Sequence, residues 1–496
     1  MPAQPEFDVV AIGGGTAGLV TAAGVAGLGA RAALIERERL GGDCLWTGCV
    51  PSKALISSAR LANGFREAAR FGLTASDPAI DGGSVMSSVR DVREVIAPHD
   101  DPERFRAMGV DVIEGSARFV SPHEVQVGDR RVTGRRFVIA TGTRAAVPPI
   151  PGLDETGYFT HAEAFERTDL PRSLAVIGGG AIGVELAQSF RRLGVDVTIV
   201  EMMDRLLIRE EPELADRLTR SLEDEGVRVI TGRVVTRVES SGSGARLYIE
   251  VPGSASARGE SVPDGDSPDP GQHVEADEIL VAVGRRPNTE DLGLEEAGVA
   301  TDRGWVTVDA KLRTSQRHIF GAGDVTGGYL FTHVADHEAR TVVQNALLPV
   351  RAKIDYRVIP WCTYTEPELA HVGLTEAEAR ERHGDSVTSH VYDLSGLDRA
   401  IAERAASGCV KVVVGKGGRI LGGHILGPSA GTMIAEIALA MKHGIAIGSL
   451  SSLVHPYPTM SEGVRRVADT YRRSLLTGWR KTLLDVAIKA GRAFPA

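Results

Sequence analysis

The apolar and polar residues form one pattern that occurs twice along the chain. Residues 7–36 read FDVVAIGGGTAGLVTAAGVAGLGARAALIE, and residues 173–201 read SLAVIGGGAIGVELAQSFRRLGVDVTIVE. Each stretch has a short apolar run, a glycine-rich turn, a helical segment and a second apolar run. Short apolar runs bounded by turn signals are typical of buried strands. The chain is therefore predicted to contain two strand–helix–strand units of an α/β protein.

Each unit carries the spacing Gly-x-Gly-x-x-Gly, with an acidic residue 23 positions after the first glycine. The residues are Gly13, Gly15, Gly18 and Glu36 in the first unit, and Gly178, Gly180, Gly183 and Glu201 in the second. In this fingerprint the first glycine turns the chain, the second lets the backbone approach a pyrophosphate, and the third lets the helix pack on the strand. The helix N-terminus then faces the phosphates. Two copies predict two dinucleotide sites.

A flavin that exchanges electrons with a nicotinamide is the natural pairing of two dinucleotides. Glu201 would accept a hydrogen bond from a free ribose 2′-OH and would repel a 2′-phosphate. Met202 and Met203 follow it where a 2′-phosphate site would need cations, although Arg205 and Arg209 come soon after. The predicted cofactors are FAD and NAD, with NADP as a possible alternative.

Two of the four cysteines, Cys44 and Cys49, lie five positions apart just after the first unit. The following segment, VPSKALISSARLANGF, has helical spacing and places Cys49 at a helix N-terminus. That position and the nearby Lys53 favour a thiolate. A zinc site would need further ligands at short spacing, and Cys362 and Cys409 are far apart in the sequence. We therefore predict a redox-active pair and no resident metal.

Two dinucleotide fingerprints with GGDCLWTGCVPSK between them resemble the pyridine nucleotide-disulfide oxidoreductases. This family includes dihydrolipoamide dehydrogenase, glutathione reductase and mercuric reductase, and the resemblance runs from residue 7 to about residue 472. It implies that Cys44 and Cys49 form a redox-active disulfide lying against FAD. Cys44 would be the interchange thiol that meets the acceptor, and Cys49 the thiolate that contacts the flavin.

Further segments occur in the order of the family. RRFVIATGTRAAVPPIPG (135–152), which contains Thr141 and Gly142, resembles the segment that closes the first FAD half. ADEILVAVGRRPNT (276–289), which contains Gly284, resembles the end of the NAD domain. The resemblance implies that these residues line the cofactor sites.

The segment TSQRHIFGAGDVTGG (314–328) resembles the motif whose aspartate, here Asp324, binds the FAD ribityl chain. Glu185 matches the acid that pairs with the lysine matching Lys53 beside flavin N5. A cation near N5 stabilises reduced flavin, and a buried cation needs a partner.

The resemblance implies two Rossmann-like dinucleotide-binding domains, for FAD and NAD(P), and a C-terminal α+β dimerisation domain. The expected boundaries are 1–152 for the first part of the FAD domain, 153–283 for the NAD(P) domain, 284–355 for the second FAD part, 356–472 for the dimerisation domain and 473–496 for an amphipathic tail. Residues 409–444 support the dimerisation domain independently, because strand-like runs joined by glycine-rich turns lead into an apolar helix.

One motif near the C-terminus departs from the family. The disulfide reductases end with His-Pro-Thr-x-x-Glu, whose histidine crosses the dimer interface as the acid–base group for the interchange thiol. Here HPYPTMSEG puts Tyr457 in the histidine position and Glu462 in that of its partner. His455 lies two residues earlier, about 6 Å of extended chain away, and is not expected to substitute for it.

Tyrosine at this point resembles mercuric reductase, because a phenol can orient or ligate a soft metal bound to thiolates without moving protons. The C-terminal cysteine pair of those enzymes and their N-terminal CxxC module are not found in this sequence.

These features predict a homodimeric, FAD-dependent NAD(P)H oxidoreductase that passes electrons through the Cys44–Cys49 disulfide to a metal ion or a small disulfide. One alternative is a dihydrolipoamide dehydrogenase, for which the histidine is missing. A second is an NAD(P)H:quinone reductase in which electrons leave directly from flavin. A flavoprotein that only binds or assembles is disfavoured, since the cysteines, Lys53 and Glu185 are all intact.

The net charge of −9 disfavours nucleic-acid binding, which needs a basic surface. The sequence has neither a run of about 20 lipid-compatible residues nor a basic leader, so a cytoplasmic location is expected. The tail has leucines and Trp479 at helical spacing among arginines and lysines. A terminal helix docked on the dimer is expected there, with a peripheral membrane contact as the alternative. The loop at 252–274 receives no function.

Overall fold

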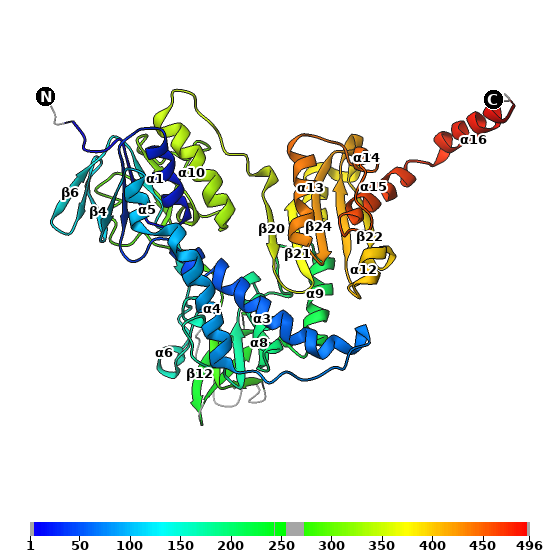
Figure 1. Cartoon of the computed structure of the whole chain (residues 1–496), viewed down its shortest axis with the longest axis horizontal. Helices are drawn as coiled ribbons and strands as arrows, with labels where there is room; N and C mark the ends of the chain where they lie inside the picture. Colours follow the sequence, from blue (N-terminus) through cyan, green and yellow to red (C-terminus); the bar gives the residue numbers. More distant parts are fainter. Residues whose placement is uncertain (1–3, 243, 254–271, 494–496) are drawn as a thin grey trace. The chain divides into compact units, whose positions relative to one another are not determined.

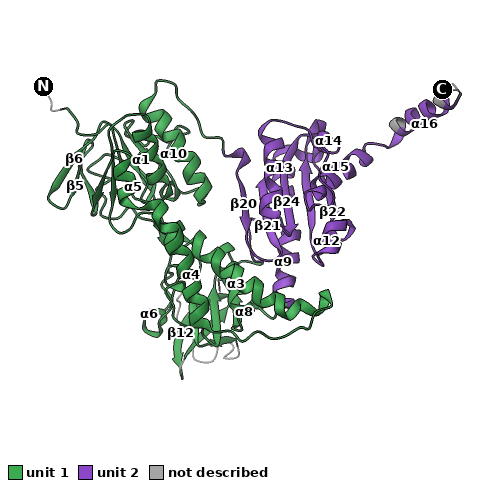
Figure 2. Cartoon of the chain, viewed as in Figure 1, with its two compact units in different colours: residues 1–204, 225–355 green, residues 205–224, 356–496 purple. Residues whose placement is uncertain are grey.

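The computed structural model describes residues 4–242, 244–253 and 272–493, so most of the loop predicted at 252–274 lies outside the described residues. The chain forms two compact units (Figure 2). Unit 1 contains residues 1–204 and 225–355, and unit 2 contains residues 205–224 and 356–496.

The first sheet of unit 1 contains the first predicted strand–helix–strand repeat. Its five strands are all parallel and follow the order β19-β7-β1-β2-β3. They are β1 (Val9–Ile12), β2 (Ala32–Glu36), β3 (Val110–Glu114), β7 (Phe137–Ile139) and β19 (Ile319–Gly321). Helix α1 (Thr16–Gly27) packs against α10 (Thr332–Leu347), and a Cβ on Gly24 would lie 3.1 Å from Val343 Cγ2. Close approach of these two helices therefore depends on a glycine.

The second sheet of unit 1 contains the second repeat. Its order is β11-β10-β9-β15, and again all strands are parallel. The strands are β9 (Ser173–Ile177), β10 (Asp196–Val200), β11 (Arg228–Ile230) and β15 (Glu278–Val281), with α8 (Ala181–Arg192) between β9 and β10. Parallel strands joined by a crossover helix are the architecture that the apolar runs predict.

Four small antiparallel sheets accompany the parallel ones within the described residues of unit 1. The first contains β4 (Ala117–Ser121), β5 (Glu124–Val127) and β6 (Arg130–Thr133), and the second β12 (Val234–Ser241), β13 (Gly244–Glu250) and β14 (His273–Ala276). The third is short and joins β8 (Thr143–Ala145) to β16 (Arg285–Pro287). Because β8 follows the first sheet and β16 follows the second, this ladder lies where the chain passes between the two nucleotide folds. Strands β17 (Thr301–Asp302) and β18 (Trp305–Val306) form a further hairpin.

The predicted redox loop leads into helices of unit 1. Helix α2 (Gly42–Trp46) is followed by α3 (Cys49–Glu67), which packs against both α4 (Gly82–Ile96) and α8 (Figure 1). The other short helices of this unit are α5 (Pro102–Ala107), α6 (Leu153–Thr156) and α7 (His161–Ala164).

Unit 2 is built on a five-stranded antiparallel sheet of order β20-β21-β24-β23-β22. Its strands are β20 (Pro360–Thr363), β21 (Glu368–Gly373), β22 (Thr388–Asp393), β23 (Cys409–Val414) and β24 (Ile420–Gly427). Its helices are α9 (Pro212–Asp224), α11 (Glu376–His383), α12 (Asp398–Ala402), α13 (Ala430–Lys442), α14 (Ile447–Leu450), α15 (Glu462–Ser474) and α16 (Gly478–Ala493).

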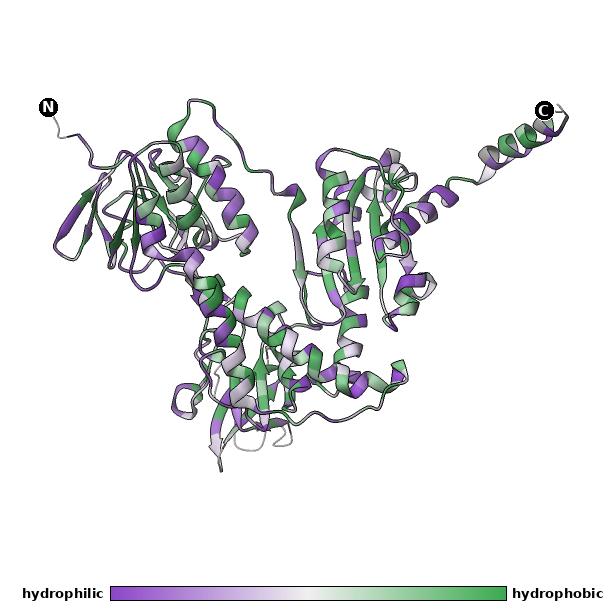
Figure 3. Cartoon of the chain, in the orientation of Figure 1, coloured by the Kyte–Doolittle hydropathy of each residue, from purple (hydrophilic) through white to green (hydrophobic). Residues whose placement is uncertain are grey.

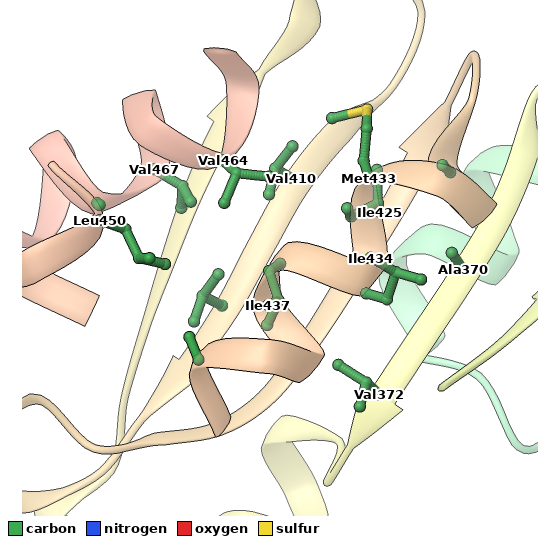
Figure 4. Packing of buried hydrophobic residues seen from close by; sticks show 14 of the residues in the cluster. Ala370, Val372, Val410, Ile425, Met433, Ile434, Ile437, Leu450, Val464 and Val467 are labelled. Carbon is green, nitrogen blue, oxygen red and sulfur yellow. The ribbon is translucent and has the colours of Figure 1, made fainter. Parts of the chain in front are cut away.

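The core of unit 2 lies between this sheet and the helices α13 and α15 (Figure 4). Ile437 of α13 and Val464 of α15 are fully buried. A Cβ on Gly423 of β24 would come within 2.7 Å of Ile437 Cγ2, so the glycine allows the helix to approach the strand. Burial of each such side chain contributes roughly 1.5–3 kcal/mol.

A buried polar layer joins the segment 205–224 to the sheet of unit 2. Lys411 Nζ lies 2.9 Å from Glu211 Oε1 and 2.9 Å from Glu376 Oε2. The indole Nε1 of Trp361 donates a hydrogen bond to Glu210 Oε1 at 2.6 Å. A buried ammonium group is costly unless it is paired, so these contacts explain why the segment belongs to this unit.

Among the described residues, no helix has the length and apolar character needed to cross a membrane.

Candidate active site

Both glycine turns leave no room for a side chain at their first and third glycines. Gly13 and Gly178 have φ angles of +109° and +110°, and a Cβ at either would lie within 2.5 Å of a carbonyl oxygen. A Cβ on Gly18 would lie 1.7 Å from the carbonyl oxygen of Gly13, and the contact of Gly183 with Gly178 is equivalent at 2.2 Å. The turns are therefore fixed by backbone contact, and substitution at these four positions requires movement of the backbone.

The second glycine of each turn leaves the helix N-terminus open. Gly15 and Gly180 are the N-cap residues of α1 and α8, and no side chain caps either helix. A Cβ on Gly180 would meet no atom within 4 Å, and one on Gly15 would meet only Gly42 Cα at 4.0 Å. Uncapped N–H groups at a helix N-terminus bind phosphate groups well. The two turns therefore fit the pyrophosphates of two dinucleotides.

The two acidic residues are held in the same way. Glu36 accepts hydrogen bonds from the backbone N–H groups of Gly14 and Glu38, at 2.5 and 2.8 Å. Glu201 accepts hydrogen bonds from those of Gly179 and Met203, at 2.5 and 2.7 Å. Each carboxylate is thus fixed at the end of its second strand, where a ribose hydroxyl could donate to it.

The residues predicted around the flavin site follow the carboxyl ends of β7 and β19 or lie next to the short β8–β16 ladder. Thr141 Oγ1 is buried and has no hydrogen-bond partner within the described residues. Asp324 Oδ2 accepts a hydrogen bond from Thr143 Oγ1 at 3.1 Å. Burial raises the pKa of Asp324, although the charge of Arg285 opposes this rise. An unpartnered hydroxyl and a desolvated carboxyl group fit a polyhydroxyl chain such as that of FAD. Gly142 and Gly284 both have positive φ beside this site.

The two cysteines lie on either side of a tight turn. Cys44 is in α2, Cys49 begins α3, and a Cβ on Gly48 would lie 2.9 Å from the carbonyl oxygen of Asp43. Both cysteines are free thiols in this structure.

The environment of the pair separates the pKa values of the two thiols. A hydrogen bond from the Cys44 thiol lowers the pKa of Cys49 to about 6, against the effect of burial, and Thr332 and Lys53 lower it further. The same hydrogen bond, together with burial, raises the pKa of Cys44. Thr332 Oγ1 lies 3.4 Å from Cys49 Sγ. The reduced pair therefore holds one thiolate, on Cys49, at neutral pH.

Lys53 and Glu185 form the ion pair that the sequence predicts. Lys53 Nζ of α3 lies 2.9 Å from Glu185 Oε2 of α8. The glutamate side chain is only 8% exposed, whereas that of the lysine is 38% exposed. An open hollow beside Cys49 and Lys53 runs between α3 and α4.

A polar network next to the redox loop escaped the sequence interpretation. Asp43 Oδ2 lies 2.5 Å from Arg285 Nη2, and Asp43 Oδ1 lies 3.3 Å from His161 Nε2. Arg285 also donates from Nε to Thr143 Oγ1 at 2.6 Å, and Thr47 donates to Asp43. Although burial opposes ionisation, hydrogen bonding with His161 and the charge of Arg285 hold the pKa of Asp43 well below its usual range. The network fixes the residue that precedes Cys44.

Only a weak sequence signal pointed to this network. Asp43 is next to Cys44 in GGDC, and Arg285 follows Gly284 in VGRRPNT, so both stood inside motifs that had been singled out. His161 had no signal of its own.

The two residues predicted at the family's acid–base position, Tyr457 and Glu462, lie in unit 2, and each pairs with a different residue. Tyr457 is 70% exposed, and its hydroxyl donates to Asp398 Oδ2 at 2.7 Å. This hydrogen bond raises the pKa of Tyr457. Glu462 is buried and pairs with Arg465 at 2.9 Å.

His455 is held elsewhere in unit 2. Its Nε2 lies 3.1 Å from Glu436 Oε2, and its side chain is only 6% exposed. His455 is therefore held by Glu436 of α13, whereas Tyr457 is held by Asp398 of α12.

Two family models match this chain. The pyridine nucleotide-disulphide oxidoreductase model matches residues 7–339, and the dimerisation-domain model of the same family matches residues 359–468. The dimerisation domain supports a homodimer.

Named relatives and solved structures agree with these matches. A mercuric reductase of Staphylococcus aureus is 36% identical over 477 residues, covering 95% of this chain and 83% of the relative. A dihydrolipoyl dehydrogenase of Thermus scotoductus is 35% identical over 479 residues, covering 95% and 98%. The Cu(II) complex of the HOCl-induced flavoprotein disulfide reductase RclA from Escherichia coli has a TM-score of 0.82 at 29% identity, covering 94% of this chain and 99% of that one.

These findings confirm the fold class and the family that the sequence predicts, and with them FAD and NAD(P) as cofactors. The chain belongs to the pyridine nucleotide-disulphide oxidoreductase family and is a flavin-dependent enzyme of that family.

Proposed function

We propose that this enzyme delivers electrons from NADH through Cys44 and Cys49 to a soft metal ion or, as the other acceptor class, to a compact disulfide. The observation that carries the proposal is the position of Cys49 at the start of α3, with Thr332 Oγ1 3.4 Å from its sulfur and Lys53, which pairs with Glu185, on the same helix. A tyrosine in place of a proton-transferring histidine at position 457 favours the metal ion.

The polypeptide supplies the cofactor sites in unit 1. We propose that the first glycine turn, Thr141 and Asp324 hold FAD, and that the second turn and Glu201 hold the nicotinamide dinucleotide. Bound FAD supplies the two-electron relay between the nicotinamide and the thiols. Glu185 fixes Lys53, so that a cation stays beside the thiolate of Cys49.

We keep the domain boundaries proposed from the sequence and add that one segment of the NAD(P) range packs with the dimerisation domain. We place the FAD domain at 1–152 and 284–355, the NAD(P) domain at 153–283 and the dimerisation domain at 356–472. Within the NAD(P) range, residues 205–224 pack with the dimerisation sheet.

The reduced pair has the chemistry to reduce either acceptor class. Two sulfur ligands are what soft metal ions prefer. Oxidation of the thiolate–thiol pair to the disulfide releases one proton to solvent and two electrons, which reduce one Hg(II) to Hg(0) or two Cu(II) to Cu(I). For a disulfide acceptor, the Cys44 thiolate attacks one sulfur and releases the first thiolate. Cys49 then attacks Cys44, which reforms the Cys44–Cys49 bond and releases the second thiolate. Cys44 must lose its proton in both cases, because its thiol has the raised pKa.

Tyr457 bears on the choice between these acceptors. A hydrogen bond to Asp398 raises its pKa, so the phenol does not accept a proton at pH 7. Oxidation of a dithiol such as dihydrolipoamide requires a base, whereas coordination of a metal by thiolates does not require one at this position. The relatives include mercuric reductases, and the RclA structure is described as a Cu(II) complex. A thiophilic metal ion is therefore the acceptor that we favour over lipoamide.

We infer that NADH is the preferred donor. The Glu201 carboxylate is fixed by two backbone N–H groups, and its charge would repel a 2′-phosphate. Met202 and Met203 beside it are exposed and uncharged.

The central test is anaerobic NADH oxidation by the wild type and by Cys44→Ser with four acceptors in turn: thiol-complexed Hg(II), Cu(II), lipoamide and a water-soluble quinone. We expect turnover with one of the two metals to exceed that with lipoamide, and to fall at least ~100-fold in Cys44→Ser, because the dithiol carries the electrons. Quinone turnover that survives in Cys44→Ser, with no cysteine-dependent acceptor in the panel, would instead identify electron loss directly from flavin.

Removal of the Thr332 hydroxyl tests whether its hydrogen bond stabilises the thiolate of Cys49. We expect Thr332→Val to raise the pKa of Cys49 by roughly one unit, because a hydrogen bond to a charged group contributes about 1.5 kcal/mol and one pKa unit equals about 1.4 kcal/mol. Thiolate absorbance of the reduced enzyme, followed over pH, measures this value directly and should show a midpoint near 6 in the wild type. Thr332→Ser is the matched control and should keep the wild-type midpoint. An unchanged midpoint in Thr332→Val contradicts the assignment.

Replacement of the tyrosine tests why lipoamide is disfavoured. Histidine has a pKa near 6.5 and accepts protons at pH 7, so Tyr457→His should increase dihydrolipoamide oxidation by NAD at least ~10-fold. Tyr457→Phe is the control and should give no increase. High dihydrolipoamide activity in the wild type, lost in Tyr457→Phe, argues for the dihydrolipoamide dehydrogenase alternative.

The donor preference is tested at Glu201. Glu201→Gln keeps an oxygen for the backbone N–H groups but removes the charge that repels a 2′-phosphate. We expect the ratio of kcat/KM for NADPH to that for NADH to rise ~10-fold, since one charge-assisted hydrogen bond contributes about 1.5–3 kcal/mol. Glu36→Gln serves as a matched control in the other turn and should leave that ratio unchanged.

A further inference from the structure

The last helix, α16 (Gly478–Ala493), exposes apolar side chains that a terminal helix would normally bury. Leu483 is 56% exposed, Leu484 45%, Val486 58% and Ile488 45%. Within the described residues, its recorded side-chain hydrogen bond joins Thr482 to Gly478 of the same helix. The sequence favoured a terminal helix docked on the dimer, and in the single chain the described side chains from 481 to 490 are all exposed.

The apolar and charged residues of α16 lie on different faces. Leu483, Val486, Ala487 and Ala490 follow the spacing i, i+3, i+4 and i+7, which places them on one side of a helix. Leu484 lies at the border of this side, whereas Ile488, seven residues after Lys481, lies on the charged side. Figure 3 shows that α16 carries both hydrophobic and hydrophilic residues. Lys481, Asp485 and Arg492 share the opposite side, by the spacings i, i+4 and i+11. The helix is therefore amphipathic.

The charge of this region is opposite to that of the whole chain. Residues 472–492 contain six basic side chains and one acidic side chain, whereas the chain has a net charge of −9. Exposed Leu475 and Leu476 continue the apolar character between α15 and α16. A helix with an apolar face and a basic face matches a surface that is apolar beneath a layer of negative charge, which is the composition of an anionic lipid bilayer.

We propose that α16, together with the end of α15, binds the surface of an anionic lipid bilayer. The apolar face of Leu483, Val486 and Ala490 enters the boundary between headgroups and acyl chains, with the helix lying in the plane of the membrane. Lys481, Lys489 and Arg492 contact the anionic headgroups. This surface is independent of the electron acceptor, because it lies outside the residues that hold the cofactors and the cysteine pair.

Vesicle co-sedimentation of the purified holoenzyme tests this binding. Vesicles of phosphatidylcholine alone are compared with vesicles that also contain phosphatidylglycerol. We expect pelleting with the anionic vesicles only, and a loss of affinity in Lys481→Gln/Lys489→Gln on the order of 30-fold, since each basic residue near such a surface contributes about 1 kcal/mol. Leu483→Asp should abolish binding, whereas Leu73→Asp, at a leucine that is 67% exposed in unit 1, should bind as the wild type does.

Two results would overturn the proposal. One is equal pelleting of the wild type with neutral and anionic vesicles, or equal pelleting of the wild type and Leu483→Asp. The other is a change from dimer to monomer in Leu483→Asp, measured by sedimentation, because α16 would then be a contact between subunits. NADH oxidation in the absence of vesicles should be unchanged in all these variants, which separates this test from that of the proposed function.

Discussion

The ion pair between Arg285 and Asp43 is the contact on which the geometry of the redox loop depends. Arg285 stands on the short ladder where the chain passes between the two nucleotide folds, and Asp43 stands immediately before Cys44. The same guanidinium binds Thr143, and Thr143 in turn binds Asp324. One cation therefore joins the redox loop, the crossover strands and the predicted flavin carboxylate. The Arg285 side chain is 10% exposed and that of Asp43 is 37% exposed, so loss of Asp43 leaves a mostly buried guanidinium without this partner.

The same neighbourhood sets the balance of charge around the cysteines. The negative charge of Asp43 opposes ionisation of both thiols, whereas Lys53 and Thr332 favour the thiolate of Cys49. The largest effect is the hydrogen bond between the two thiols, which lowers the pKa of Cys49 to about 6 and raises that of Cys44. An interchange thiol with a raised pKa needs help to lose that proton when it attacks a disulfide. Coordination to a thiophilic metal ion supplies that help directly, because a coordinated thiol is deprotonated by the metal.

The sequence predicted the features that depend on backbone sterics and on short spacing. Gly13 and Gly178 could be assigned because a turn with positive φ and a carbonyl within 2.5 Å admits only glycine. The contacts of Asp43 with His161 and Arg285 were missed because they join residues 118 and 242 positions apart. No local pattern reveals such a contact before the fold is known. For Tyr457 the motif gave the position, but the hydrogen bond to Asp398 depends on the start of α12, 59 residues earlier in the chain.

The segment 205–224 shows that a correct prediction of the fold class does not fix every domain boundary. Here the contacts of buried charged residues decide which unit the segment joins. It lies between two strands of the nucleotide sheet, which is why spacing alone assigns it to the NAD(P) domain. Its Glu211, however, is buried against Lys411, and Trp361 binds the neighbouring Glu210. Charges that are buried together are stable only when all partners are present, so folding of this segment requires the dimerisation sheet. The segment begins shortly after Glu201 and ends before β11, so the boundary between the two compact units falls twice within the NAD(P) range.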